Sequence, residues 1–320
     1  MTMPEVMVVY NYNRRSINRL ADSNSGGTGT NDEAQAQIVS MFTKTMSLLD
    51  EKAELLSQQR QSFSSAALTT SSSSSSSSSA YGNNTTSNAV DSLQLSLLRA
   101  DWLVKWGTSI NYNSDTSGGN ATRLLDALTL YNQCSASVDT LVTTSTPSVQ
   151  VTNNTVGGRA SINELQNHLR TSHTQHSDNL LQYFERTYAN NPNTAEHNTL
   201  VSDYLRLSDQ PESSNPCVLA AINTVKCFVA GLKVCNSYCI QRVLRLVQII
   251  GQYSVHTQDI LKIQLQNIPA WVFLQYAAQL MGSLDRPEGS VICSILEYTA
   301  SVYPNALYYP YRITSEFLGT

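Results

Sequence analysis

Charged side chains are scarce in this sequence, and neither sign strongly predominates. Lys, Arg, Asp and Glu together make up 14% of the 320 residues, and the formal net charge is −4. Proteins that bind nucleic acid through its phosphates need a basic surface, because lysine and arginine replace the condensed counterions. The composition supplies no excess of basic residues, so we predict no direct binding to nucleic acid.

Long hydrophobic runs are also missing. The longest apolar stretch, Ile268 to Gly282, is interrupted by two glutamines and is too short to cross a hydrocarbon layer of about 30 Å as a helix. The apolar run at the N-terminus contains Glu5 and is followed by Arg14 and Arg15, which reverses the charge order of a secretory signal. We therefore expect an intracellular protein that does not bind membranes.

The sequence lacks the motifs of the common catalytic sites. Phosphoryl transfer needs an Asp-Phe-Gly to hold magnesium and a glycine-rich loop to cover the phosphates, and neither is present. Asp285 and Arg286 match the start of an Asp-Arg-His kinase motif, but Pro287 stands where the histidine should be. Gly-X-Ser-X-Gly and the dinucleotide-binding glycine pattern are absent too. The sequence thus predicts no catalytic residue and no cofactor.

A metal site is not predicted either, although one group of residues contains side chains of the kind that bind metal ions. His168, His173, His176 and Asp178 lie close together in the sequence. On one continuous helix this spacing places them on different faces, which does not suit a shared metal ion. We interpret the group as a solvated polar turn.

Six cysteines are present, and we expect them to be reduced and buried rather than paired. A disulfide framework is typical of secreted proteins, and the N-terminus carries no secretion signal. Cys235 and Cys239 are four residues apart and can share a helical face, yet no second ligand pair follows at the spacing of a zinc site. The cysteines are Cys134, Cys217, Cys227, Cys235, Cys239 and Cys293.

Segments rich in Ser, Thr, Asn and Gly divide the chain. The uninterrupted serine run Ser71 to Ser79 has nothing apolar to bury, so nothing offsets the entropy cost of ordering its backbone. We predict long disordered insertions of this composition. The expected organisation is a helical segment with a disordered start (1–60), a disordered Ser-rich linker (61–92), a helical hairpin with a polar loop (93–134), a polar linker (135–160) and a helical repeat region (161–320).

Helical periodicity fills the regions between the polar segments. Apolar residues recur at helical spacing in Glu33 to Gln59, Ser92 to Trp106 and Ala121 to Tyr131. From residue 161 the predicted helices follow one another closely, with Gly- or Pro-marked turns between them. They comprise 200–207, 218–234, 240–253, 260–266, 269–284, 288–302 and 305–317. No alternation typical of strands competes with this pattern, so the predicted fold is all-α, an antiparallel helix-hairpin solenoid like TPR and HEAT repeats.

Two aromatic and proline-containing segments stand out near the C-terminus. They are Ile268-Pro269-Ala270-Trp271-Val272-Phe273 and Tyr303-Pro304-Asn305-Ala306-Leu307-Tyr308-Tyr309-Pro310. Pro269 and Pro304 each suit the first turn of a helix. Two ordinary helix starts with core aromatics would produce the same pattern, so the composition of these segments alone does not identify a function.

Taken with Arg245-Leu246-Val247-Gln248-Ile249-Ile250, Tyr253 and Leu284-Asp285, these two segments make residues 240–318 resemble the FAT region of the phosphatidylinositol-3-kinase-related protein kinases. The resemblance is weaker over residues 160–240. It implies a non-catalytic helical scaffold belonging to a longer serine/threonine kinase, packed around the kinase domain of the same polypeptide. The structural anchors, all expected to be buried apart from the helix-starting proline, are Trp271, Phe273, Tyr303, Pro304, Leu307 and Tyr308.

The family member that this segment resembles most implies a nuclear protein that joins DNA double-strand breaks by non-homologous end joining. The partners implied by that resemblance are the Ku heterodimer and DNA ends. Two alternatives remain open at this stage: the FAT segment of another kinase of the same family, and an unrelated helical-repeat adaptor that binds peptides.

Overall fold

The computed structural model describes residues 3–24, 31–69, 78–109, 119–144, 162–189, 201–206 and 215–318. Over these residues the secondary structure is helical, with no strand, which confirms the predicted all-α class. Two compact units are formed, Met1–Gln166 and Asn167–Thr320.

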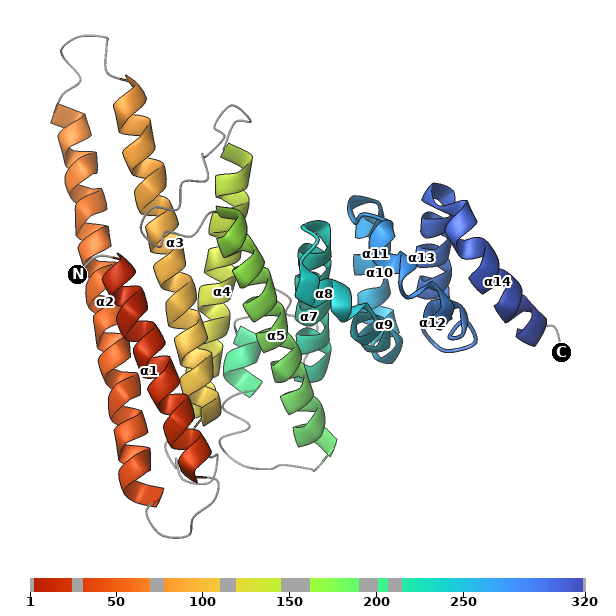
Figure 1. Cartoon of the computed structure of the whole chain (residues 1–320), viewed down its shortest axis with the longest axis horizontal. Coiled ribbons are helices and arrows are strands. Elements are labelled where there is room, and N and C mark those ends of the chain that lie inside the picture. The colour runs from red at the N-terminus through yellow and green to blue at the C-terminus, as the bar shows by residue number, and fades with distance from the viewer. Residues whose placement is uncertain are drawn as a thin grey trace. The chain divides into compact units, whose positions relative to one another are not determined.

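Unit 1 is built from four long helices that lie side by side (Figure 1). They are α1 (Met3–Asn24), α2 (Asn31–Thr69), α3 (Ser78–Ser109) and α4 (Gly119–Thr144). Trp102 on α3 forms the centre of the core, with its ring 5.1 Å from those of Tyr10 and Phe42. The Trp102 indole N–H donates to the Phe42 carbonyl at 3.2 Å, so the polar atom of this buried ring is satisfied.

Helix α1 corrects the expectation of a disordered start. Val6, Tyr10 and Ile17 are buried in the unit 1 core, and their spacing of four and seven residues places them on one face of a helix. Much of the first 24 residues is polar, but this single apolar stripe is enough to dock the helix against α2 and α3.

The polar linkers are shorter in the structure than the composition predicts. Helix α2 extends to Thr69 and α3 begins at Ser78, so most of the segment 61–92 that we expected to be disordered is helical. Helix α4 likewise continues to Thr144, beyond the predicted start of a linker at residue 135. Serine costs less than 1 kcal/mol relative to alanine in a helix, so a helix fixed by buried residues such as Leu93 continues into such sequence. Residues 70–77, 110–118 and 145–161 lie outside the described residues.

Unit 2 is a succession of shorter helices, which follow one another along the chain in Figure 1. It begins inside α5 (Ile162–Ala189) and includes a helical turn at 201–206. The remaining elements are α7 (Pro216–Lys233), α8 (Ser237–Gln241), α9 (Val243–Gln252), α10 (Ser254–Gln264), η1 (Leu265–Asn267), α11 (Trp271–Leu274), α12 (Ala277–Met281), α13 (Gly289–Val302) and α14 (Pro304–Leu318). Neighbouring helices pack on one another, α7 on α9 and α10, and α13 on α10, α12 and α14.

Several predicted helices are confirmed, two are divided, and the one predicted at 260–266 begins earlier, as α10 at Ser254. Helices α7, α13 and α14 lie within two residues of the predicted boundaries, and Pro304 is the first residue of α14. The predicted helix 240–253 is divided between α8 and α9 at Arg242, which has φ −114° and ψ 21°. The predicted helix 269–284 is divided between α11 and α12 by a turn at Gln275 and Tyr276. Apolar periodicity continues through both interruptions, so it does not reveal them.

Helix α7 is the one described helix long and apolar enough to cross a membrane. Within unit 2 it is a core helix, because 72% of its residues are buried. Its N-terminus is capped by Asn215, whose side chain accepts from the Cys217 N–H at 2.9 Å, and Pro216 occupies the first turn, where its missing N–H costs nothing.

Candidate functional site

The six predicted anchors divide into buried and exposed residues. Phe273 and Leu307 lie in the core of unit 2, with 1% and 5% of their surface exposed. Trp271 is 46%, Tyr303 38% and Tyr308 54% exposed, so their predicted burial was wrong. Pro304 is exposed at the start of α14.

Helix geometry explains why these aromatic residues are exposed. Helix α11 has only four residues, and Val272 and Phe273 occupy the positions that face the core. Trp271 therefore projects away from it. Leu307 faces α12 and α13 from α14, and Tyr308 is rotated by about 100° from it around the helix axis. An aromatic run in sequence cannot lie on a single helical face.

Two tyrosines that the sequence did not single out link neighbouring elements. The Tyr276 hydroxyl donates to the Ile240 carbonyl at 2.9 Å, which joins the turn after α11 to α8. The Tyr298 hydroxyl of α13 donates to the Ile268 carbonyl, also at 2.9 Å. Both carbonyls lie near helix ends, where intrahelical donors run out. In the sequence, each of these tyrosines is marked only by an apolar core residue one to two helical turns away.

The histidine group lies within helix α5 and is not a solvated turn. His173, His176 and Asp178 are buried, and His168 is exposed. The prediction failed because α5 is continuous through these residues and three of the four are buried. Burial, with the neighbouring His176 and Arg170 contributing, lowers the pKa of His173 to about 3, so this imidazole is neutral at pH 7.

Asp178 forms an ion pair with Arg245 of α9. The Arg245 Nε and Nη2 donate to the same Asp178 oxygen at 3.1 and 3.0 Å, and the other oxygen accepts from Gln182 at 3.2 Å. Glu185 lies 3.9 Å from Arg245 and accepts from the Tyr253 hydroxyl at 3.2 Å. Burial and the Glu185 carboxylate raise the pKa of Tyr253, so the phenol remains a donor at neutral pH.

The other end of the same α5 face contacts Asn236, the buried N-cap of α8. The Asn236 amide donates to the Asn167 carbonyl and the Thr171 hydroxyl, both at 3.0 Å. Its oxygen accepts from the Cys239 N–H at 3.2 Å. One side chain therefore both caps α8 and fixes it to α5.

The cysteines are free thiols, but not all are buried as predicted. Cys235 and Cys293 are exposed, and the other four are buried. Cys235 lies in the loop before α8 with a φ of 54°, so it does not share a helical face with Cys239. Cys239 and Cys227 contact Thr174 at 3.6 Å and Ser177 at 3.5 Å on α5, and burial raises the pKa of both thiols to about 11. Among the described residues no group of three or more His, Cys, Asp or Glu is arranged to hold a metal ion.

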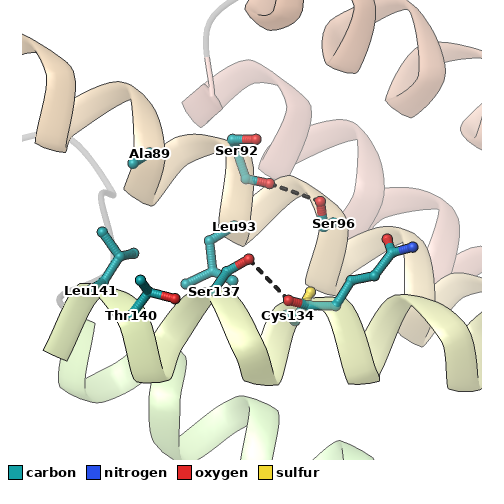
Figure 2. A pocket seen from close by; sticks show the side chains of 9 residues that line it. Ala89, Ser92, Leu93, Ser96, Cys134, Ser137, Thr140 and Leu141 are labelled. Atoms are coloured by element: carbon teal, nitrogen blue, oxygen red, sulfur yellow. Dashed lines mark hydrogen bonds between the residues drawn. The ribbon is translucent and has the colours of Figure 1, made fainter. Parts of the chain in front are cut away.

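A hollow in the described part of unit 1 lies between α3 and α4 (Figure 2). Its volume is about 340 Å³. Ser96 and Ser137 line it, and their hydroxyls donate to the carbonyls of Ser92 and Gln133 on their own helices, at 3.0 and 2.9 Å. Cys134 also lines the hollow, and burial, together with Asp101, raises the pKa of this thiol to about 12. The lining therefore presents small, neutral groups and no activated nucleophile.

The residues that resembled a kinase loop lie in a turn on the surface of unit 2. Asp285, Arg286 and Pro287 are exposed in the turn between α12 and α13. The surrounding described elements are helices, and none supplies the strand lysine or the glycine-rich hairpin that holds ATP phosphates.

Comparison with known proteins gives a short region of similarity. No family model matches the chain. Over 78 residues, 24% of the chain, it is 37% identical to the DNA-dependent protein kinase catalytic subunit of Dictyostelium discoideum. The mouse and Xenopus laevis proteins of the same name are 35% and 33% identical over 92 residues, 29% of the chain. The chain spans about 2% of the length of these curated relatives.

Proposed function

We propose that residues 240–318 are a FAT-like helical scaffold segment of a kinase similar to the DNA-dependent protein kinase catalytic subunit. The observation that carries the proposal is the local similarity to three such proteins over 78 to 92 residues, a length close to that of this segment. The motifs that suggested the FAT region all lie in the part of unit 2 that runs from α8 to α14, in its helices and in the turns between them.

The packing of these motifs supports a scaffold role. Arg245 and Tyr253 are bound by acidic side chains of α5, the Ile268 carbonyl accepts from Tyr298, and Phe273 and Leu307 fill the core. These five motif residues each contact a neighbouring element or fill the core between elements. Side chains used in this way hold the curvature of a helical stack, which is what a non-catalytic solenoid around a kinase domain requires.

The proposal also includes a biological role, which is inferred from the similarity to these relatives. The segment would support the kinase domain of its own polypeptide in a nuclear protein that repairs double-strand breaks by non-homologous end joining. Ku and DNA ends would bind elsewhere in that protein, since the chain has no basic excess. Catalysis would likewise belong to the kinase domain rather than to these helices.

A segment exchange tests the proposal. In Dictyostelium, the aligned segment of the DNA-dependent protein kinase catalytic subunit is replaced by residues 240–318 of this chain, and kinase activity stimulated by DNA ends and Ku is measured in cell extracts. We expect the chimera to accumulate and to keep most of its activity. A matched chimera carrying Phe273→Asp should lose both, whereas Gln279→Asp at an exposed position should lose neither.

Two results of this experiment contradict the proposal. The first is a stable chimera without stimulated activity, since it would show that the helices pack but do not support the kinase. The second is equal activity of the Phe273→Asp and Gln279→Asp chimeras. An antibody raised against α13 and α14 adds an independent readout, because the proposal expects the native product to be far longer than 320 residues.

The alternative of a helical-repeat adaptor draws on one feature of α14. Tyr308, Tyr309, Tyr311 and Ile313 are exposed on this helix, and aromatic residues are enriched at protein interfaces. If the chain acts as an adaptor, the native product recognised by the same antibody should be about the size of this chain and should carry no associated kinase activity.

A further inference from the structure

Helices α1 and α2 present an exposed surface on the side of unit 1 that points away from their shared core. Val8 and Tyr12 each follow a buried residue of α1 by two positions, which turns them about 200° away from the core, and each is 69% exposed. Lys44 and Glu51 stand in the same relation to buried residues of α2 and are exposed as well. We call the outward side chains of residues 5–19 and 44–55 the α1–α2 face.

The basic charges of the α1–α2 face gather at one end. The Asn13 amide donates to the Thr45 hydroxyl at 2.8 Å, so these two residues mark one level on helices that run antiparallel (Figure 1). Arg15 and Arg19 lie beyond this level on α1, and Lys44 lies just beyond it on α2. All three are exposed. Among the described residues, neither arginine has an ion-pair partner.

The acidic charges of the α1–α2 face gather at the other end. Glu51 and Glu54 follow Thr45 by six and nine residues, which places them about 9 and 14 Å from that level, towards the start of α1. Both are exposed, whereas Lys52, which lies between them in the sequence, is half-buried. Leu55 adds an apolar side chain, 41% exposed, to this end. The face is therefore polarised along the helices, acidic at one end and basic at the other.

A surface polarised in this way is complementary to a second copy of itself. A two-fold axis that crosses the helices at right angles lays the acidic end of each copy over the basic end of the other, so that every contact is made twice. Tyr12 lies about midway between the two ends and would meet its counterpart near the axis, and aromatic residues are enriched in protein interfaces. A nucleic acid or an anionic lipid surface would instead meet Glu51 and Glu54 with charge of the same sign.

We propose that the chain forms a two-fold symmetric dimer through the α1–α2 face, with Arg15 and Arg19 of each copy against Glu51 and Glu54 of the other. Burial of exposed apolar groups such as Tyr12 supplies attraction, and the charges fix the orientation of the two copies. The dimer is independent of the scaffold role proposed for residues 240–318, because α1 and α2 belong to unit 1.

Sedimentation velocity of the whole chain tests the dimer. Over about 1 to 100 µM the unmodified chain should pass from monomer to dimer, since an interface of exposed charges and a few apolar groups has modest affinity. Arg15→Glu/Arg19→Glu makes both ends of the face acidic, and Glu51→Lys/Glu54→Lys makes both ends basic. Each variant alone should raise the dissociation constant about tenfold or more, because like charges then meet across the axis.

Mixing the two variants separates this interface from any other. An acidic face and a basic face are complementary, so the mixture should form a heterodimer, measured by energy transfer between a donor on one variant and an acceptor on the other. The matched control is Arg286→Glu/Arg312→Glu, which changes the net charge as Arg15→Glu/Arg19→Glu does, but at exposed sites of unit 2. This control should dimerise like the unmodified chain.

Circular dichroism of each variant distinguishes dissociation from unfolding. Tyr12→Ser, which changes no charge, should also weaken the dimer about tenfold, and it keeps the proposal testable if a charge variant does not fold. Three outcomes would overturn the proposal: an unmodified chain that stays monomeric over the whole concentration range, a charge variant or Tyr12→Ser that dimerises as the unmodified chain does, or a folded mixture that forms no heterodimer.

Discussion

The guanidinium of Arg245 on α9 donates two hydrogen bonds to one oxygen of Asp178 on α5, across 67 residues of sequence. The Asp178 side chain is 3% exposed, and that of Arg245 is 19% exposed. A buried pair of this kind contributes little net stability compared with apolar residues of the same size, but the loss of one partner leaves an uncompensated charge.

Replacing Arg245 by Met should therefore destabilise unit 2 by about 3 kcal/mol, measured by urea denaturation followed by circular dichroism. Arg312→Met is the matched control, because Arg312 and Glu316 form an exposed pair on α14, and exposed pairs are worth about 1 kcal/mol or less. The double replacement Asp178→Leu/Arg245→Met should recover part of the loss. Equal effects of the two arginine variants would show that the ion pair with Asp178 does not matter.

Phe273 and Trp271 are two residues apart on α11 but differ in burial. Replacing each of them by Ala should therefore lower the stability by different amounts. Phe273→Ala removes a buried ring and should cost about 3 to 5 kcal/mol. Trp271→Ala should cost about 1 kcal/mol or less, because its ring is nearly half exposed. Thermal unfolding of the two variants, compared with the unmodified chain, decides between them. A larger loss for Trp271→Ala would mean that this ring packs in the core.

The outcomes at these two positions show which structural features the sequence predicts and which it does not. Local signals were read correctly: the apolar stripes of α2 and α3, the proline that opens α14 and the short helix at 201–206 all lie where they were predicted. The direction in which a side chain points depends on where a helix begins and breaks, and apolar periodicity does not specify this for short helices such as α11. Trp271 was consequently assigned to the core.

The polar face of α5 was missed for a related reason. Sequence gives no measure of burial for His173, His176 or Asp178, and polar residues in a group are more often solvated. Asp178 pairs with Arg245, which lies 67 residues further along the chain and was noted only as part of a motif. Long-range pairing of this kind leaves no local signature in a single sequence.

The stability of unit 2 should fall in mild acid because of His173. Its pKa is about 3 in the folded chain and 6.5 when exposed, so the unfolded state binds the proton first. The stabilisation is present above pH 6.5 and decreases by about 1.4 kcal/mol per pH unit as the pH falls from 6.5 towards 3. Urea denaturation at pH 7.5, 6.0 and 5.0 measures this slope, and His173→Gln should flatten it. His256→Gln, on the exposed side of α10, should leave the slope unchanged.

Gly231 on α7 is required by the close approach of Cys239. A Cβ at position 231 would overlap the Cys239 sulfur and lie 3.1 Å from its Cβ, so Gly231→Ala must move α8 despite the helix propensity that alanine adds. We expect it to lower the free energy of unfolding by about 1 to 3 kcal/mol. Cys239→Ala removes the overlapping sulfur, so the double variant should be less destabilised than the sum of the single changes.

Gly282→Ala, whose Cβ would meet only backbone oxygens at 3.5 Å or more, should be tolerated. Strict additivity of the first pair would show that the two residues do not limit the packing of α7 against α8.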